Sequence, residues 1–328
     1  MRSRLRKYTV VDLFSGAGGF SLGFHLTNRF ETLLAVDNYN PAGLTYKLNF
    51  PRVRVLLEDV KDLNASLLRK ILGDTRIDVL IGSPPCEPYT GANPRRERTP
   101  LDRLYKDPAG QLTLHYIRVL GILQPRVFVM ENVPAIVEDG LKDALRREFE
   151  RVGYGEVYFN ILEAEKYGTP SHRRRMFVSN IKIEPEPSPA KITVEEALRD
   201  LPPPGNYPPN HEMPKEPSAR KIKKMSRLDW GEAMIRYQGA EKELPNLIRL
   251  HPKKIAPTVL GSSRFIHPYE NRFLTVREQA RLMGFPDSFI FTGGRDDQYN
   301  MIGEAVPVPL AKAIGLYVAR KLDEEGGY

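Results

Sequence analysis

The 328-residue sequence contains one cysteine, Cys86, and one tryptophan. A single thiol excludes an internal disulfide and any zinc or iron–sulfur site built from several cysteines, so we expect no metal centre. The sequence also lacks an apolar run near the roughly 20 residues that a membrane-spanning helix needs. Its basic start, residues 1–7, is followed by an apolar stretch that ends at Asp12 and is too short for a signal peptide. We therefore expect a cytoplasmic protein without membrane contact.

The chain has fewer acidic than basic residues. There are 41 Asp and Glu against 49 Lys and Arg, which gives a formal net charge of +8. A basic surplus favours a polyanionic partner such as nucleic acid, because neutralised phosphates release counterions. A soluble protein that is basic for other reasons remains an alternative. With 41% hydrophobic residues, the chain is long enough for one large domain and a smaller one.

Short apolar segments alternate with helical segments along the first half of the chain. We expect strands at residues 8–13, 32–37, 53–59, 77–83 and 126–132, and two more at 155–168 and 174–181. Helical spacing follows the first two segments and recurs near 111–123. This alternation predicts a doubly wound, mostly parallel α/β sheet.

The amino-acid composition changes near residue 182. Prolines are dense over 185–217, where long helices and central strands are excluded, and a basic segment follows at 219–230. Regular helical patterns return at 275–285 and 309–322. We therefore expect a large domain made of residues 1–182 plus 268–328, and a smaller, loop-rich domain at 183–267.

A glycine-rich turn follows the first expected strand. Gly16, Gly18 and Gly19 let a ligand approach the backbone at the start of a helix. Asp37 ends the second strand, where a carboxylate can accept hydrogen bonds from ribose hydroxyls. Asp59 ends the third strand and could reach an adenine edge. Because Ser21 stands where a dinucleotide fingerprint would have glycine, S-adenosylmethionine is favoured over NAD, while simple glycine packing and a solvated Asp59 remain alternatives.

Cys86 lies in the segment Ser-Pro-Pro-Cys-Glu-Pro-Tyr-Thr, directly after the fourth expected strand. The flanking prolines stiffen the chain and hold the thiol at the carboxyl edge of the sheet, where open α/β sheets bind ligands. The loop that continues to Gly110 is polar and basic and includes Arg95 and Arg96. It resembles a mobile lid that closes over nucleic acid. A buried inert cysteine and a plain solvated loop are the alternatives.

Two further segments carry candidate chemistry. Glu131 ends an apolar strand, so its carboxyl could be partly desolvated and engage a heterocycle nitrogen. Arg173 and Arg175 share one face of an expected strand, while Arg174 points away. Two arginines on one side could bind a base oxygen and a phosphate. A structural carboxylate and a solvated charge run are the corresponding alternatives.

Taken in order, these segments resemble the DNA (cytosine-5)-methyltransferase family. The resemblance covers nearly the whole chain apart from about 183–250 and includes later motifs at 267–289 and 298–315. It implies a class I S-adenosylmethionine-dependent fold with a target recognition domain. It also implies methyl transfer to C5 of a flipped-out cytosine in double-stranded DNA, through a covalent bond between Cys86 and C6, with S-adenosylhomocysteine as product. A nucleoid-associated monomer is expected, and a cognate restriction endonuclease is a further candidate partner.

The resemblance also assigns roles to individual residues. Cys86 would be the nucleophile, Glu131 the acid at N3 and Arg175 the contact to the cytosine O2, with Arg173 as its pair. The implied cofactor-binding residues are Phe14, Ser15, Gly16, Ala17, Gly18, Gly19, Asp37, Asn38, Asp59, Val60, Pro85, Glu304 and Ala305. The expected DNA-binding residues are Thr90, Arg95, Arg96, Lys221, Lys223, Lys224, Arg227, Arg236, Tyr237 and Gln238.

Three residues depart from the family pattern. Glu87 stands in place of glutamine, Tyr89 in place of phenylalanine and Glu304 in place of asparagine. The charge of Glu87 beside Cys86 is expected to raise the thiol's pKa. Three other functions stay open: the same chemistry on tRNA, a non-catalytic nucleic-acid-binding homologue, and a Rossmann dehydrogenase. Methylation of duplex DNA against tRNA, trapping by 5-fluorocytosine DNA and titration with NAD would separate them.

Overall fold

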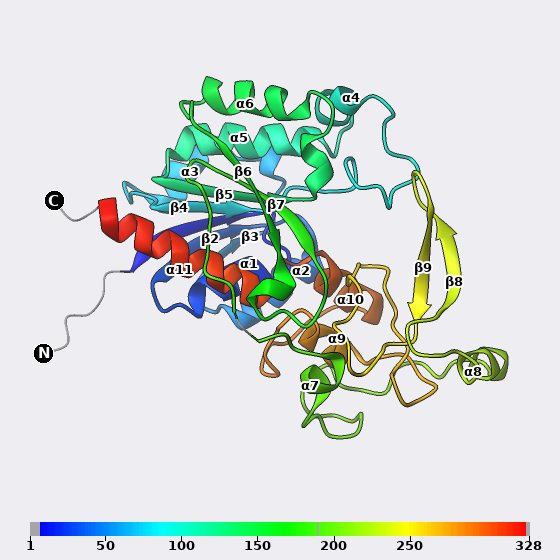
Figure 1. Ribbon diagram of the computed structural model, residues 1–328. Coiled ribbons are helices and arrows are strands. Elements are labelled where there is room, and N and C mark those ends of the chain that lie inside the picture. The colour runs from blue at the N-terminus through cyan, green and yellow to red at the C-terminus, as the bar shows by residue number, and fades with distance from the viewer. Residues whose placement is uncertain (1–6, 189, 326–328) are drawn as a thin grey trace, which may run out of the picture.

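The computed structural model describes residues 7–188 and 190–325, so most of the basic start, residues 1–6, lies outside the described residues. Its centre is a seven-stranded sheet of order β3-β2-β1-β4-β5-β7-β6 between layers of helices (Figure 1). The strands are β1 (Tyr8–Leu13), β2 (Phe30–Val36), β3 (Arg54–Leu56), β4 (Val79–Gly82), β5 (Val127–Asn132), β6 (Tyr158–Glu163) and β7 (Arg174–Ser179). From β3 to β5 all pairs are parallel, and β7 is antiparallel to both of its neighbours. The expectation of a mostly parallel α/β sheet is confirmed.

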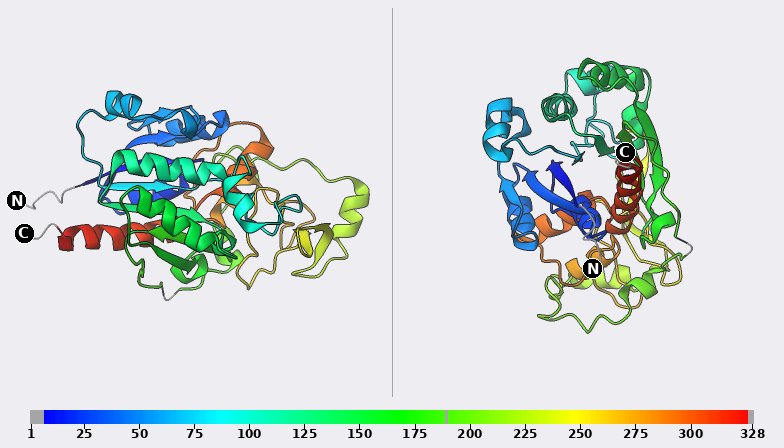
Figure 2. Two further views of the ribbon diagram at one scale, coloured as in Figure 1. Left: turned by 90° about the horizontal axis from the view of Figure 1, so that it is seen from above. Right: turned by 90° about the vertical axis from the view of Figure 1, so that its left-hand side faces the viewer.

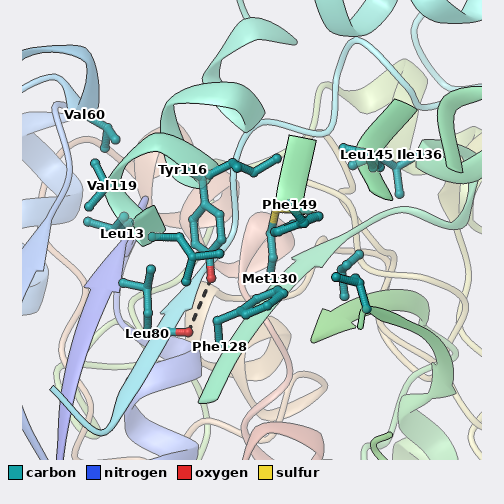
Figure 3. Packing of buried hydrophobic residues seen from close by; sticks show 14 of the residues in the cluster. Leu13, Val60, Leu80, Tyr116, Val119, Phe128, Met130, Ile136, Leu145 and Phe149 are labelled. Atoms are coloured by element: carbon teal, nitrogen blue, oxygen red, sulfur yellow. Dashed lines mark hydrogen bonds between the residues drawn. The ribbon is translucent and has the colours of Figure 1, made fainter. Parts of the chain in front are cut away.

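Helices cover both faces of the sheet (Figure 2). Those before β6 are α1 (Gly19–His25), α2 (Asn40–Asn49), α3 (Ala65–Leu72), α4 (Pro100–Tyr105), α5 (Gln111–Leu123) and α6 (Leu141–Arg151). One hydrophobic cluster joins the sheet to α3, α5 and α6, and another joins it to α1 and α11 (Val308–Glu325). In the first cluster the rings of Phe128 and Phe149 stack with centroids 4.9 Å apart, and the Tyr116 hydroxyl donates to the Leu80 carbonyl (Figure 3). Parallel strands buried on both faces explain the continuous apolar runs of the sequence.

Three expected elements are shorter than the sequence pattern suggested. The strand expected at 53–59 is only β3, because the Asp59 side chain accepts from the Lys61 amide and starts the 3₁₀ turn η1 (Val60–Asp62). The strand expected at 155–168 ends with β6, and the turn η3 (Ala164–Tyr167) follows it. The helix expected at 275–285 is α9 (Val276–Arg281), and Gly284 after it has a φ of 77° that no helix continues through.

The second half of the chain surrounds one end of the sheet. Its elements are α7 (Val194–Leu198), α8 (Ala219–Met225), the hairpin of β8 (Ala233–Gln238) and β9 (Glu243–Ile248), α9 and α10 (Arg295–Glu304). The 3₁₀ turn η2 (Pro134–Val137) belongs to the first half and directly follows β5. The proline-rich stretch holds only short elements, as expected. Val194 and Leu250 from the proposed smaller domain pack in the same hydrophobic cluster as Tyr46 of α2. The proposed division at 183 and 267 therefore crosses a shared core.

Helix α11 returns the chain to the sheet beside α1. Gly23 of α1 lies against it so closely that a Cβ there would be 2.3 Å from the Cβ of Ala311 and 2.5 Å from the Lys312 backbone nitrogen. Within the described residues, no helix by itself is long and apolar enough to cross a bilayer. The bent pair α10 and α11 reaches that length and apolarity only when taken together.

We expect Gly23→Ala to destabilise the fold. The added methyl group meets backbone atoms of α11, and overpacking of this kind costs about 1–3 kcal/mol, more than the helix propensity that alanine gains. Urea unfolding followed by circular dichroism measures the change. Gly155→Ala is the control, because nothing lies within 4 Å of a Cβ at that position. Equal stability of the two variants would contradict this packing.

Candidate active site

A cavity of about 580 Å³ opens at the carboxyl ends of β1, β4 and β5. The strand order reverses between β1 and β4, so the connections that follow these two strands run in opposite directions and leave a crevice. The turn after β1 and the loop after β4 both line this crevice. It is also lined by Leu260, Gly261 and Ser262 and by the end of α10. The cavity brings the expected cofactor loop and Cys86 together.

The glycine turn after β1 is held open by Asp37. One carboxylate oxygen of Asp37 accepts from the Gly16 amide at 2.8 Å, and the other accepts from the Tyr39 amide at 2.9 Å. Gly16 has a φ of +52° and open space where a side chain would be, so its backbone faces the cavity. The Ser15 hydroxyl is buried at the cavity wall and has no hydrogen-bond partner among the described residues. Burial raises the pKa of Asp37, and the two amide hydrogen bonds oppose that shift.

Most of the expected cofactor residues line the cavity, namely Phe14, Ser15, Gly16, Ala17, Gly19, Asp37, Asn38, Asp59, Val60, Pro85, Glu304 and Ala305. Gly18 does not. A Cβ on Gly18 would lie within 2.9 Å of the Tyr46 and Phe50 rings, so this glycine permits α1 to pack against α2. Its φ of 93° is a second reason for glycine at this position.

Ser21 and Asp12 form a buried pair below the glycine turn. The Ser21 hydroxyl donates to Asp12 at 2.7 Å, and both residues are almost fully buried. Burial, and secondarily the charge of Asp37, raise the pKa of Asp12 to about 8 against the opposing hydrogen bond from Ser21. Asp12 also lines the cavity, which the sequence reasoning missed. The signal was present, because Asp12 interrupts an apolar strand and Ser21 replaces the expected glycine.

The Cys86 loop is anchored at both ends. The Asn132 amide donates to the Pro84 carbonyl at 3.0 Å, and the amides of Tyr89 and Thr90 donate to the Cys86 carbonyl. The fully buried Tyr89 ring places its hydroxyl 3.2 Å from that of Thr113, which accounts for tyrosine at this position. Cys86 lines the cavity and packs partly against the core. Asn132 is a positioning residue that the sequence reasoning left unassigned.

The thiol of Cys86 is strongly held in its protonated form. Burial is the main cause, and the charge of Glu87 adds to it, raising the thiol's pKa to about 12. Arg175 and Arg173 lower it by smaller amounts. The expectation that Glu87 raises this pKa is confirmed in direction, although burial contributes more than the charge.

Glu131 and Arg175 form an ion pair on the cavity wall. The Arg175 Nε lies 2.9 Å from Glu131 Oε1, and both side chains are largely buried. Arg173 lines the same cavity but is fully buried and donates to the carbonyls of Val259, Gly303 and Glu304. Burial, with the neighbouring charge of Arg175, lowers the pKa of Arg173 to about 9, which still leaves it cationic at neutral pH. In this geometry Arg173 ties β7 to the end of α10, while Arg175 contacts Glu131.

Glu304 ends α10 and lines the same cavity as Cys86. Burial of its carboxyl, followed by the charges of Glu87 and Asp37, raises the pKa of Glu304 to about 7, although Arg173 opposes the shift. The two carboxylates that depart from the family pattern, Glu87 and Glu304, thus line one cavity, and the charge of Glu87 contributes to the raised pKa of Glu304.

The expected DNA-binding residues fall into two groups. Thr90 and Tyr237 line the cavity, and Tyr237 brings the β8–β9 hairpin to its rim. The others lie outside it, and most are exposed on α8, the hairpin and the loop after Cys86: Arg95, Lys221, Lys223, Lys224, Arg227, Arg236 and Gln238. Arg96 is mostly buried and paired with Glu241.

Comparison with known proteins accords with this geometry. Residues 8–319 match the profile of the C-5 cytosine-specific DNA methylase family. The chain is 50% identical over 317 residues to the provisionally named type II methyltransferase M.MJ0563P of Methanocaldococcus jannaschii, covering 95% of this chain and 99% of that protein. It is 36% identical to the type II methyltransferase M1.HphI of Haemophilus parahaemolyticus, covering 93% and 85%.

A solved structure shares the whole fold. It is a DNA modification methyltransferase, also provisionally named, encoded within a prophage of E. coli; it is 27% identical, covers 96% of this chain and 100% of that one, and superposes with a TM-score of 0.77. The family profile matches nearly the whole length of the chain, and a relative of similar length is 50% identical to it. Both findings assign the chain to the same family. The chain belongs to the C-5 cytosine-specific DNA methylase family.

Proposed function

We propose that this chain transfers a methyl group from S-adenosylmethionine to C5 of a cytosine in double-stranded DNA, through a covalent intermediate on Cys86. The observation that carries the proposal is the single cavity lined by Cys86, Glu131, Arg175 and the glycine turn. The reacting ring must leave the DNA stack to enter this cavity, so the proposal includes base flipping. Residues 183–267 would form the target recognition domain. We further propose that the protein acts as a monomer associated with the nucleoid, and a restriction endonuclease remains a candidate partner.

The cavity residues in and around the glycine turn have the polar groups that S-adenosylmethionine requires. The unpartnered Ser15 hydroxyl and the partly exposed Gly16 backbone offer polar contacts before the start of α1, and the Asp37 and Asp59 carboxylates can accept from hydroxyl and amino groups. Glu304 would lie near the cationic part of the cofactor. When bound, the cofactor supplies an electrophilic methyl group.

Cys86 begins the reaction. Its sulfur forms a bond to C6 of the cytosine, and the electron pair of the C5–C6 double bond moves toward C5 and N3. C5 then takes the methyl group, the C5 proton leaves to a base, and the sulfur departs as the C5–C6 double bond returns. Because the thiol's pKa is raised to about 12, its proton must be removed when the bond forms.

Glu131 and Arg175 act on the far side of the ring. Glu131 would hold a proton or hydrogen bond at N3, where negative charge develops, and Arg175 keeps the carboxyl oriented through the 2.9 Å contact. Arg175 would also donate to O2 of the cytosine. Arg173 supports both residues from behind, because it holds β7 against the end of α10.

Replacing Cys86 by alanine is expected to abolish methyl transfer and leave DNA binding intact. The variant keeps the loop's hydrogen bonds, which involve only the backbone at this position. Bisulfite sequencing of DNA incubated with purified protein and S-adenosylmethionine reads both the reaction and the target site. Adduct formation with 5-fluorocytosine DNA should occur in the wild type alone. Parallel assays on duplex DNA and tRNA decide the substrate, and methylation by the variant would refute the covalent route.

Replacing Glu87 by glutamine is expected to increase the reactivity of the thiol at neutral pH. Glu87 raises the thiol's pKa, so removing its charge lowers that pKa and enlarges the thiolate fraction at any pH below it. Lower intrinsic nucleophilicity offsets part of the gain, which leaves a few-fold increase. Because Cys86 is the only cysteine, its alkylation by iodoacetamide between pH 7 and pH 10 reports this directly. Glu97→Gln, on the same loop, is the control, and coincident pH profiles for the two variants would contradict the charge effect.

Replacing Glu131 by glutamine is expected to slow the chemical step by on the order of 100-fold, because an amide cannot deliver a proton to N3. Single-turnover methyl transfer measures this step apart from product release. Cofactor affinity should stay unchanged, since the side chain lies on the base side of the cavity. An unaltered single-turnover rate would remove Glu131 from the mechanism.

A further inference from the structure

The loop that follows Cys86 is docked onto the tip of the β8–β9 hairpin. Figure 1 shows the segment between β4 and α4 reaching across to the hairpin. The Ala240 amide donates to the Gly91 carbonyl at 2.8 Å, and Arg96 Nη2 lies 2.5 Å from Glu241 Oε1. A Cβ on Gly239 would be 2.8 Å from the Gly91 oxygen, so the approach depends on glycine there.

Arg96 connects this contact to the Cys86 turn. Its Nη1 donates to the Tyr89 carbonyl at 2.8 Å, and the Tyr89 amide in turn donates to the Cys86 carbonyl. The Arg96 side chain is only 9% exposed, whereas its partner Glu241 is 76% exposed. Glu138, at 3.8 Å, is the second carboxylate near the guanidinium. The arginine is therefore fixed in place, and its exposed partner is the one that solvent or a ligand can replace.

The contact lies at the rim of the catalytic cavity. Thr90 and Ala92 of the loop and Tyr237 of β8 all line that cavity. Under the proposed function, a DNA strand that delivers an extruded base to Cys86 would approach this rim, where the loop meets the hairpin. Its phosphates present the same oxygen geometry to a guanidinium as a carboxylate does.

We propose that Glu241 occupies the phosphate site of Arg96 in the free protein and that the DNA backbone displaces it. When DNA enters, a phosphate accepts the hydrogen bond that Arg96 Nη2 donates to Glu241 in the free protein. The phosphate likewise replaces the Gly91 carbonyl as the acceptor for the Ala240 amide, so the loop loses its contacts with the hairpin and gains a contact with DNA. No covalent step is involved. This inference rests on the proposed action on DNA, and it names Glu241 as a competitor that lowers DNA affinity.

Glu241→Gln tests the competition. Binding of a fluorescein-labelled, random-sequence duplex to the full chain is measured by anisotropy with S-adenosylhomocysteine present. We expect affinity to rise about two- to fivefold, the range of one exposed ion pair. Glu243→Gln is the matched control. Glu243 is an exposed carboxylate on the same hairpin without an ion pair among the described residues, and its replacement should change affinity by less than about twofold.

Two further variants separate the ion pair from general charge. Gly239→Ala adds a methyl group against the Gly91 carbonyl without altering charge, and it should both raise DNA affinity and speed hydrogen exchange of the Ala240 amide. In an Arg96→Gln background, Glu241→Gln should do no more than Glu243→Gln, because the partner is gone.

The outcomes are distinct. If Glu241→Gln raises affinity only in the presence of Arg96, the competition stands. If Glu241→Gln and Glu243→Gln have equal effects, or if affinity falls, Glu241 is not a competitor. Methylation in the bisulfite assay would in that case still support the proposed function. If the wild type binds no duplex at all, both the competition and the proposed DNA substrate are wrong.

Discussion

The site depends on one constraint, the parallel pairing of β1 with β4 at the point where the strand order reverses. Both strands end at the same edge, and because the strand order reverses between them, the connections that follow them run in opposite directions. The turn after β1 faces the cavity with Gly16 and Ser15, and the loop after β4 brings Cys86 to it. Without this pairing, the glycine turn and the Cys86 loop would not line one common cavity.

Hydrogen bonds from buried side chains keep these two segments in position. Asp37 fixes the glycine turn through two backbone amides, and Asn132 fixes the Cys86 loop through the Pro84 carbonyl. Arg173 holds the start of β7 against the end of α10, because its guanidinium donates to three backbone carbonyls and to no carboxylate among the described residues. A buried polar or charged group whose hydrogen bonds join separate segments is costly to disturb, so such groups favour one arrangement of the loops they join.

The electrostatics of the cavity disfavour the charged forms of its thiol and of one of its carboxylates. Burial and Glu87 both disfavour the thiolate, while burial, followed by the charges of Glu87 and Asp37, raises the pKa of Glu304 and favours its neutral form. A positively charged ligand between these carboxylates would relieve their mutual repulsion. The two departures from the family pattern therefore belong to one electrostatic arrangement, and the docked loop adds a further pair, Arg96 and Glu241, at its rim.

The sequence by itself determined the sheet, the order of its motifs and the edge where they meet, because strand periodicity, glycine turns and proline-flanked loops are local signals. It correctly indicated that Glu87 raises the pKa of Cys86, since the two are neighbours in the chain. Only the tertiary structure decided which side chains pair over long separations. Ser21 meets Asp12 across a turn, Arg173 reaches Val259 and Gly303, and Arg96 finds Glu241 on a distant hairpin. Such contacts have no periodicity or spacing in the chain, because they arise from the way separate elements pack.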